Sequence, residues 1–209
     1  FTLIEWLAVE GSEAQRRRFF SDVVKGHIIT NAIAESTTKT PGHFETSLRR
    51  HGDRYRLNGT KYYSTGSLIA DQFFILAITE AGSRAVAIVP TTRAGVEIID
   101  DWDGMGQRTT ASGTTRLVDV EVDAEEIMPV TTRRNYVGAA AQIVHAAIDV
   151  GIAKAALRDA VAYARAQARP VFESGVDRAT DDPYVLHLVG EMTVIADSAE
   201  ALLYHSAEK

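Results

Sequence analysis

The sequence predicts an α+β fold in which a β-rich middle segment lies between helical segments. Short runs of strand-forming residues, separated by turn signals, fill residues 27–130. Apolar residues recur at helical spacing from about Val137 onward, and residues 1–26 also read as helical. No internal repeat or low-complexity tract interrupts this order. We therefore divide the chain into segments 1–26, 27–130 and 131–209.

The N-terminal segment contains a signal for the start of a helix. Glu10-Gly11-Ser12 precedes Glu13, and a serine at such a position accepts a hydrogen bond from a first-turn amide. We expect Ser12 to be the N-cap.

The middle segment reads as an antiparallel β-sandwich or barrel, because its short runs alternate regularly with turns. Asn58-Gly59 is expected at the tip of a hairpin, since both residues of a two-residue turn take positive φ. The expected strands are 27–34, 46–50, 53–57, 61–65, 72–79, 84–90, 95–99 and 115–122.

The C-terminal segment predicts two long helices. The first is alanine-rich with one apolar stripe and should end before Pro170, because proline cannot continue a helix. The second should begin where Asp181 or Asp182 caps it and Pro183 occupies its first turn. Alanine-rich stripes bury little surface within one short chain, so we expect a homodimer or homotetramer built through these helices.

The composition excludes several classes of function. A net charge of −6 leaves no basic footprint for nucleic acid or an anionic membrane. There is no cysteine, and the six histidines show no metal-ligand spacing, so no metal site is expected. No uninterrupted apolar run approaches the ~20 residues of a membrane span. The lack of cysteine fits a cytoplasmic protein. The acidic pairs Asp100-Asp101 and Glu125-Glu126 are expected in exposed turns. Because the chain opens at Phe1 and stops at Lys209 inside a helical stretch, we expect both ends of a longer protein to be absent.

Two segments carry a family resemblance. Residues 57–66 read LNGTKYYSTG, and residues 102–122 read WDGMGQRTTASGTTRLVDVEV. Both resemble the middle β-domain of the acyl-CoA dehydrogenase superfamily of flavoenzymes, where similar segments occur in the same order. The resemblance implies that segment 1–26 ends an N-terminal helical domain. It also implies a middle β-domain at 27–130 and the start of a C-terminal helical bundle at 131–209.

A narrower branch of this superfamily fits better. Residues 31–32, 63–66, 101–102, 112–114 and 167–170 resemble the bacterial dibenzothiophene monooxygenases and related sulfur-acquisition oxidoreductases. The glycine-rich tail that helps acyl-CoA dehydrogenases to hold their thioester substrate is replaced here by residues 37–41, TTKTP. The resemblance therefore implies a monooxygenase that uses reduced FMN and oxygen on a small organosulfur compound, with a flavin reductase as partner.

The resemblance also assigns roles to individual residues. Tyr63 would stack near the flavin ring, and Ser64 and Thr65 would lie near its reactive nitrogen. Trp102 and Ser112 would line the cavity shared by flavin and substrate. Arg169 would bind the cofactor phosphate. The flavin pyrimidine edge would be bound by a set from one segment, Asn31, Ile33, Ala34 and Ser36.

Other interpretations remain open for the same residues. Taken alone, Asn31 is equally a strand-end residue and Tyr63 an ordinary sheet residue. Trp102 could simply pack under a loop, and Arg169 could complement a helix dipole. The first functional alternative is an FAD-dependent acyl-CoA dehydrogenase, and the second is a non-catalytic assembly protein with a helical bundle. The catalytic residues are unknown and are expected beyond Lys209.

Overall fold

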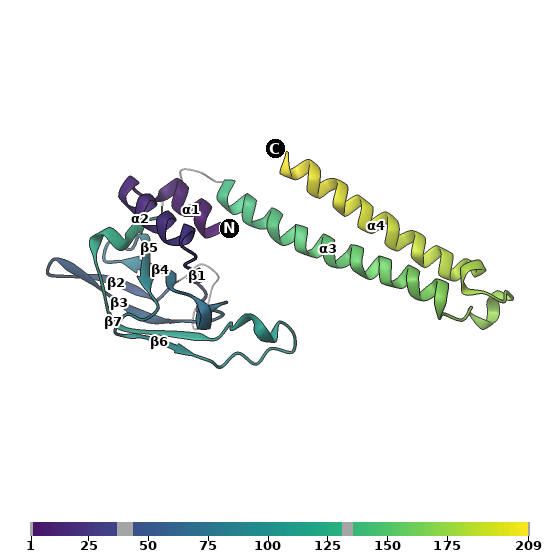
Figure 1. Cartoon of the computed structure of the whole chain (residues 1–209), viewed down its shortest axis with the longest axis horizontal. Helices are drawn as coiled ribbons and strands as arrows, with labels where there is room; N and C mark the ends of the chain where they lie inside the picture. The colour runs from purple at the N-terminus through teal and green to yellow at the C-terminus, as the bar shows by residue number, and fades with distance from the viewer. Residues whose placement is uncertain (1, 37–43, 131–135, 209) are drawn as a thin grey trace. The chain divides into compact units, whose positions relative to one another are not determined.

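The computed structural model describes residues 2–36, 44–130 and 136–208. The chain divides into two compact units, Phe1–Arg134 and Asn135–Lys209. The first contains two short helices and all the described strands, and the second contains two long helices (Figure 1).

The first unit begins with α1 (Thr2–Glu10) and α2 (Glu13–Val24). Ser12 is the N-cap of α2, as predicted. Its hydroxyl accepts from the Gln15 amide at 3.2 Å, while the Gln15 side chain accepts from the Ser12 amide at 2.9 Å. This reciprocal pair satisfies two amides that have no partner within the helix.

The strands follow the predicted runs closely in the central part of the segment. Two predictions, 72–79 and 84–90, match the observed strands at both ends, and the last short strand was not predicted. The strands are β1 (Ile29–Ala32), β2 (Ser47–His51), β3 (Arg54–Lys61), β4 (Gln72–Thr79), β5 (Arg84–Pro90), β6 (Val96–Ile99), β7 (Thr114–Val122) and β8 (Ile127–Pro129).

The sheet has the order β6-β7-β3-β2-β4-β5-β8, and β1 also pairs with β4. Most pairs are antiparallel, but β1 and β2 both run parallel to β4. The sheet is therefore mixed rather than wholly antiparallel. The two parallel strands share one edge of β4, where β1 pairs with residues 72–75 and β2 with residues 78–79.

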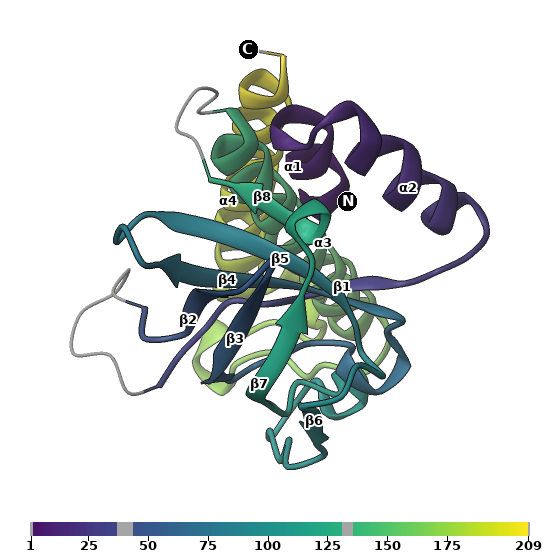
Figure 2. The same cartoon turned by 90° about the vertical axis from the view of Figure 1, so that its left-hand side faces the viewer.

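Alternate residues of the central strands enter two separate cores. Phe73 and Ile75 of β4 join a cluster with Leu57 of β3 and Val120 of β7, while Phe74 packs with Leu7 and Phe19 of the two helices. Since β7 and β5 are four places apart in the sheet yet contribute to one cluster, the sheet curves around that core (Figure 2). Helices α1 and α2 pack on the other face of the sheet, against β4 and β5.

Asn58-Gly59 is not a hairpin tip, contrary to the prediction. Both residues lie inside β3, and the tip of the β2–β3 hairpin is at Gly52-Asp53. The Asn58 side chain accepts from the Asp119 amide at 2.8 Å, at a bulge where β7 has an extra residue. A Cβ at Gly59 would lie 2.8 Å from the Cα of Thr46. The glycine is thus needed for close backbone approach rather than for a turn.

Glu126 is buried, although the sequence predicted an exposed turn. Its carboxylate accepts from Arg93 at 2.5 and 2.9 Å, from Arg18 at 3.2 Å and from the Asp123 amide at 3.1 Å. Burial alone would raise the pKa of Glu126, but these donors outweigh burial and hold the pKa below its ordinary value. The Glu126 carboxylate therefore ties α2, through Arg18, to the start of β8.

The second unit is an antiparallel helix pair, α3 (Tyr136–Ala166) and α4 (Pro183–Ala207) (Figure 1). Asp182 caps α4, as one of the two predicted candidates. Its carboxylate accepts from the Tyr184 amide at 2.8 Å and from the Val171 amide at 2.5 Å, which fixes the connector. Lys154 and Glu200 form an ion pair across the two helices at 2.5 Å.

Residues Gly138–Ala166 of α3 are long and apolar enough to cross a membrane by length and composition. One such helix is a weak indication, because a core helix of a helical bundle has the same composition. Five charged residues interrupt the stretch, namely Asp149, Lys154, Arg158, Asp159 and Arg165.

Candidate functional site

The candidate site is built by two loops of the first unit, residues 62–66 after β3 and residues 102–113 before β7. Among the described residues, four non-glycine residues have positive φ, and three of these lie here: Tyr63 at 53°, Gln107 at 54° and Ala111 at 48°. Such conformations cost about 1–3 kcal/mol each and persist only where surrounding contacts fix them. Tyr63 and Thr65 therefore belong to an irregular loop, not to the strand predicted at 61–65.

Backbone hydrogen bonds join the two loops. The Ser64 amide donates to the Gly113 carbonyl at 3.0 Å, and the Gly66 amide donates to the Thr110 carbonyl at 2.7 Å. Gly113 itself approaches β6 closely, since a Cβ there would lie 2.2 Å from the Ile99 carbonyl oxygen.

A chain of hydroxyl groups crosses the junction of the loops. The Thr65 and Ser112 hydroxyls are 2.8 Å apart, and Ser112 and Thr110 are 2.7 Å apart. Thr110 also lies 2.9 Å from the Gln107 carbonyl oxygen. The structure thus brings together Thr65 and Ser112, which the sequence assigned to one site.

The chain has a direction, because a carbonyl oxygen can only accept. When Thr110 donates its proton to the Gln107 carbonyl, all three bonds form together only if Ser112 donates to Thr110 and Thr65 donates to Ser112. Thr65 uses its one proton inside the protein, and its side chain is exposed. It therefore presents an acceptor, not a donor, to any ligand at this surface.

Tyr63 and Trp102 form the aromatic part of the site. Their ring centroids are 6.0 Å apart in an edge-to-face arrangement, and Tyr63 remains 64% exposed. The Trp102 indole donates to the Gln107 carbonyl at 2.9 Å. A Cβ at Gly104 would lie 2.4 Å from the indole ring, so the lack of a side chain at this position leaves room for the ring.

Ser64 is placed differently from its neighbours. It is fully buried, and its hydroxyl has no hydrogen-bond partner among the described residues. The backbone of Ser64 is instead fully bonded within the loops. Its amide donates to the Gly113 carbonyl, and its carbonyl accepts from the Ser67 amide at 3.0 Å. A buried hydroxyl without a partner marks a place where a ligand or water can supply one.

The end of β1 lies alongside the same loop. Thr30 donates its hydroxyl proton to the Thr65 carbonyl, and the Ala34 carbonyl accepts from the Tyr62 amide at 2.9 Å. These bonds bring Thr30 and Ala34 to the loop that carries Tyr63 and Thr65. Within it, Ile33 is half-buried, and three members are exposed: Asn31, Ala34 and Ser36. Residues 37–41, which replace the glycine-rich tail, lie outside the described residues.

Lys61 and Glu35 were not predicted. Both side chains are buried, and Lys61 Nζ lies 2.6 Å from Glu35 Oε1. Burial lowers the pKa of Lys61 despite its partner. Burial alone would raise the pKa of Glu35, but donors from Glu45, Lys61 and Thr46 hold it below the ordinary value. Strand alternation was the available signal, since Lys61 faces the same side of β3 as buried Leu57.

Asp101 supports the loop before β7. Its carboxylate accepts from the Thr114 hydroxyl and from the Thr114 amide, both at 2.7 Å. The hydroxyl and amide donors of Thr114 lower the pKa of Asp101. The acidic residue is therefore a structural acceptor that fixes the start of β7 next to Ser112.

Arg169 lies in the second unit, in the connector that follows α3, and its side chain is exposed. The helix ends before it, where the Gln167 and Ala168 amides both donate to the Tyr163 carbonyl. The role of Arg169 stays a prediction.

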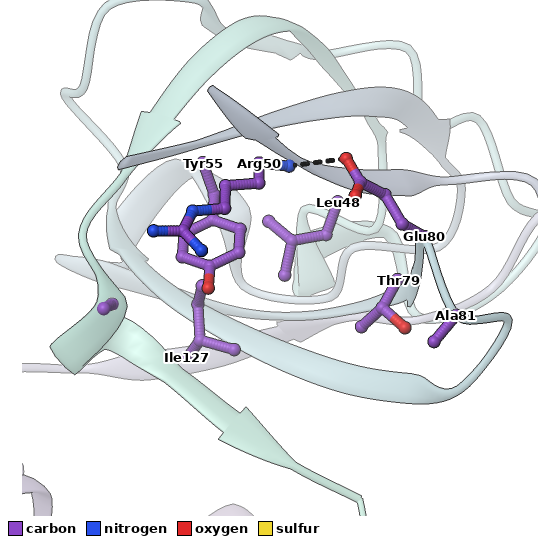
Figure 3. A pocket seen from close by; sticks show the side chains of 8 residues that line it. Leu48, Arg50, Tyr55, Thr79, Glu80, Ala81 and Ile127 are labelled. Atoms are coloured by element: carbon purple, nitrogen blue, oxygen red, sulfur yellow. Dashed lines mark hydrogen bonds between the residues drawn. The ribbon is translucent and has the colours of Figure 1, made fainter. Parts of the chain in front are cut away.

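The hollow shown in Figure 3 lies elsewhere in the first unit. It has a volume of about 360 Å³ and is lined by residues of β2, β3 and the β4–β5 turn, among them Leu48, Tyr55 and Glu80. The Arg50 amide donates to Glu80 at 2.9 Å across its rim. None of the predicted site residues lines it.

Comparison with known proteins identifies the family. Residues 31–120 match the middle domain of acyl-CoA dehydrogenases, and residues 143–209 match their C-terminal domain. Both loops of the candidate site fall within the first match.

Several similar proteins are named as monooxygenases. The chain is 30% identical over 213 residues to dibenzothiophene monooxygenase from Rhodococcus qingshengii, covering 94% of this chain and 51% of that protein. It is 29% identical over 171 residues to a probable FMNH2-dependent monooxygenase, SfnC from Pseudomonas putida, covering 77% of this chain and 42% of that protein. The crystal structure of TdsC from Paenibacillus sp. A11-2 with FMN and indole superimposes with a TM-score of 0.81 at 28% identity, covering all of this chain and 57% of that chain.

The chain spans about half the length of the curated relatives that it matches. Its two domain matches agree in order with its two compact units. The mixed sheet of the first unit corresponds to the middle domain, and the antiparallel helix pair of the second unit corresponds to part of the C-terminal domain. The chain therefore belongs to the acyl-CoA dehydrogenase family.

Proposed function

We propose that this chain is part of a flavin-dependent oxidoreductase, a monooxygenase that uses reduced FMN and oxygen on a small organosulfur compound. The observation that carries the proposal is that the two loops bring together a hydroxyl pair, Thr65 and Ser112, and an aromatic pair, Tyr63 and Trp102. The names of the similar proteins, dibenzothiophene monooxygenase and FMNH2-dependent monooxygenase, support the substrate class and the cofactor.

The residues present fit a flavin. Tyr63 and Trp102 offer aromatic surface to a planar ring, and Thr65 offers a hydroxyl acceptor beside them. The buried Ser64 hydroxyl without a partner adds a polar group that a ligand or water can satisfy. We infer that the exposed end of β1 binds the pyrimidine edge of the ring through a set of four residues, Asn31, Ile33, Ala34 and Ser36. We further infer that Arg169 binds the phosphate, a task that suits a guanidinium.

The direction of the hydroxyl chain favours the reduced cofactor. Reduced flavin carries an N–H at its reactive nitrogen, whereas oxidised flavin has an acceptor there. Because Thr65 presents an acceptor, it suits the reduced form. Reduced FMN would supply the electrons with which one oxygen atom of O2 is added to sulfur and the other is released as water. Trp102 and Ser112 would limit the space for substrate and keep bulk water away from it.

The remaining assignments follow from the same proposal. Segments 1–26, 27–130 and 131–209 would be the end of an N-terminal helical domain, the middle β-domain and the start of a C-terminal helical bundle. The protein would act in the cytoplasm as a homodimer or homotetramer, with a separate flavin reductase supplying reduced FMN.

The identity of the bound flavin tests the proposal. The purified protein is denatured, and the released cofactor is identified by its mass, followed by titration of the flavin-free protein with FMN and FAD. We expect preferential binding of FMN. Preferential binding of FAD would support an acyl-CoA dehydrogenase, and binding of neither would support a non-catalytic protein. If FMN binds, uptake of oxygen that depends on reduced FMN and an added organosulfur compound tests the reaction.

A further inference from the structure

The buried ion pair of Lys61 and Glu35 lies next to the candidate site but presents no group to its surface. The Lys61 side chain is fully buried and that of Glu35 is 3% exposed. The Lys61 ammonium also lies 5.3 Å from the ring of Phe44. An ion pair so deeply buried stabilises a fold weakly, because removing two charges from water is costly. Its geometry therefore calls for another explanation.

Lys61 and its neighbour Tyr62 fix three consecutive residues of the segment that leaves β1. Lys61 donates to the Ile33 carbonyl at 3.2 Å, and its neighbour Tyr62 donates through its amide to the Ala34 carbonyl at 2.9 Å. The next residue is Glu35 itself, which Lys61 holds at 2.6 Å. No pairing with β4 extends past Ala32, so these bonds replace the sheet hydrogen bonds there.

A second set of bonds anchors Glu35 from the opposite side. Its carboxylate accepts from the Thr46 hydroxyl at 2.6 Å, the Thr46 amide at 3.2 Å and the Glu45 amide at 2.6 Å. Thr46 is itself held against Gly59 of β3, where there is no space for a Cβ. The carboxylate is thus fixed both by Lys61 of β3 and by the two residues that precede β2.

Because Glu35 points inward, the side chains on either side of it in the sequence point toward solvent. Side chains alternate along this extended segment, so Ala34 and Ser36 are exposed while Glu35 is buried. The same segment lies beside Thr65 through the Thr30 hydroxyl and beside Tyr62 through Ala34. The position of the exposed backbone relative to the Tyr63–Thr65 loop therefore depends on the pair.

We propose that Lys61 and Glu35 are positioning residues that hold the backbone of residues 33–36 beside the Tyr63–Thr65 loop for flavin binding. This inference rests on the proposed function, because the ligand that benefits is the flavin. The pair acts through the segment it anchors and touches no ligand itself. Such supporting groups commonly determine the precision of a site.

The chain offers a matched control for a purely structural role. Glu126 is also a buried carboxylate held by cations and a backbone amide, but it anchors α2 and the Arg93 loop. Glu35→Gln and Glu126→Gln should both lower the denaturant midpoint of unfolding. We expect only Glu35→Gln to raise the dissociation constant of FMN, by about tenfold, the scale of lost support for a ligand group. FMN binding is measured in the flavin-free protein by quenching of flavin fluorescence.

The double variant Glu35→Gln/Lys61→Met separates positioning from stability. It leaves no buried charge unpaired, so its unfolding midpoint should recover relative to Glu35→Gln. FMN affinity should stay weak, because methionine cannot donate to the Ile33 carbonyl. This variant also decides the matter if Glu35→Gln fails to fold. In the flavin-free protein, the backbone amides of residues 33–36 should exchange hydrogen faster in Glu35→Gln and in the double variant, but not in Glu126→Gln.

The outcomes distinguish the two proposals. FMN affinity that recovers together with stability in the double variant would show a structural pair and overturn the inference. Equal loss of FMN affinity in Glu126→Gln would overturn it as well. If the unaltered protein binds no FMN, the proposed function fails and this inference fails with it. FMN binding by the unaltered protein without any loss in Glu35→Gln overturns the positioning role alone.

Discussion

The hydroxyl oxygens of Thr65 and Ser112 lie 2.8 Å apart, although 47 residues separate them in the sequence. Thr65 is exposed and Ser112 is 8% exposed, so the bond connects the surface of the site to its interior. Because Ser112 passes its own proton to Thr110, Thr65 is held as an acceptor. This relationship gives the candidate site a chemical preference that can be measured.

Thr65→Val is expected to weaken reduced FMN more than oxidised FMN. Valine has nearly the shape of threonine but lacks the acceptor that suits the N–H of the reduced ring. The loss of one hydrogen bond is worth about 1 kcal/mol, or roughly a fivefold rise in the dissociation constant of reduced FMN. Anaerobic titration with both redox forms measures it. Thr79→Val is the control, since it removes a similar hydroxyl pair with Ser83 at 2.7 Å in the β4–β5 turn. Equal binding of both forms by Thr65→Val and the unaltered protein would contradict the assignment.

Arg169→Ala is expected to weaken FMN by about 1.5–3 kcal/mol, the scale of a hydrogen bond to a charged group. Riboflavin lacks the phosphate, so its affinity should not change. Titration with both ligands measures the difference. Arg165→Ala removes another arginine, in the last turn of α3, and should leave FMN affinity unchanged. A similar loss for riboflavin would show that Arg169 does not act on the phosphate.

Acid should destabilise the protein through Glu126. Its pKa in the folded protein lies below the ordinary value of 4.5, so the folded state favours the ionised carboxylate more than the unfolded state does. That stabilisation is present above pH ~4.5 and is lost as the pH falls through the folded pKa. Glu126→Gln should therefore lower the free energy of unfolding by about 1–3 kcal/mol at pH 7. The difference from the unaltered protein should shrink at pH values below 4.5, and a difference that is constant with pH would argue against this account. Urea unfolding at several pH values measures it.

Gly59→Ala should destabilise the first unit by about 1–3 kcal/mol, the usual range for overpacking. Its Cβ would lie 2.4 Å from the Thr46 hydroxyl oxygen and 2.8 Å from the Thr46 Cα. Gly106→Ala is the control, because no atom lies within 4 Å of a Cβ there. Thermal unfolding compares the two variants. If both unfold at the same temperature, the close approach at Gly59 is not the reason for the glycine.

The second unit should associate with further copies of the protein. Its helices expose apolar side chains such as Ile148, Ile152 and Ile195, at 56%, 63% and 69%. Covering such residues is favourable by about 25 cal/mol per Å² of apolar surface. Light scattering at micromolar concentration should give the mass of a dimer or tetramer, and Ile152→Glu should reduce it. A monomeric mass for the unaltered protein would exclude this association.

Local signals were sufficient for much of the secondary structure. The runs 72–79 and 84–90 became β4 and β5 because their residues are apolar on both faces and turns bound them. Ser12 and Asp182 cap helices as their sequence positions indicated, because capping involves only residues within one turn. The family resemblance placed Thr65 and Ser112 in one site, and the structure joins them.

Tertiary contacts decided the rest. Asn58-Gly59 has the local preference of a turn, but pairing with β7 and the bulge at Asp119 keep it inside β3. Three-residue β8 has too little sequence to show a period. Lys61, Glu35 and Glu126 are charged residues that a sequence assigns to the surface, and only distant partners make their burial possible. The sequence alone therefore determined elements whose stabilising contacts lie within a few residues. Burial of charge and the direction of the hydroxyl chain depend on atoms brought together by folding, so only the tertiary structure could decide them.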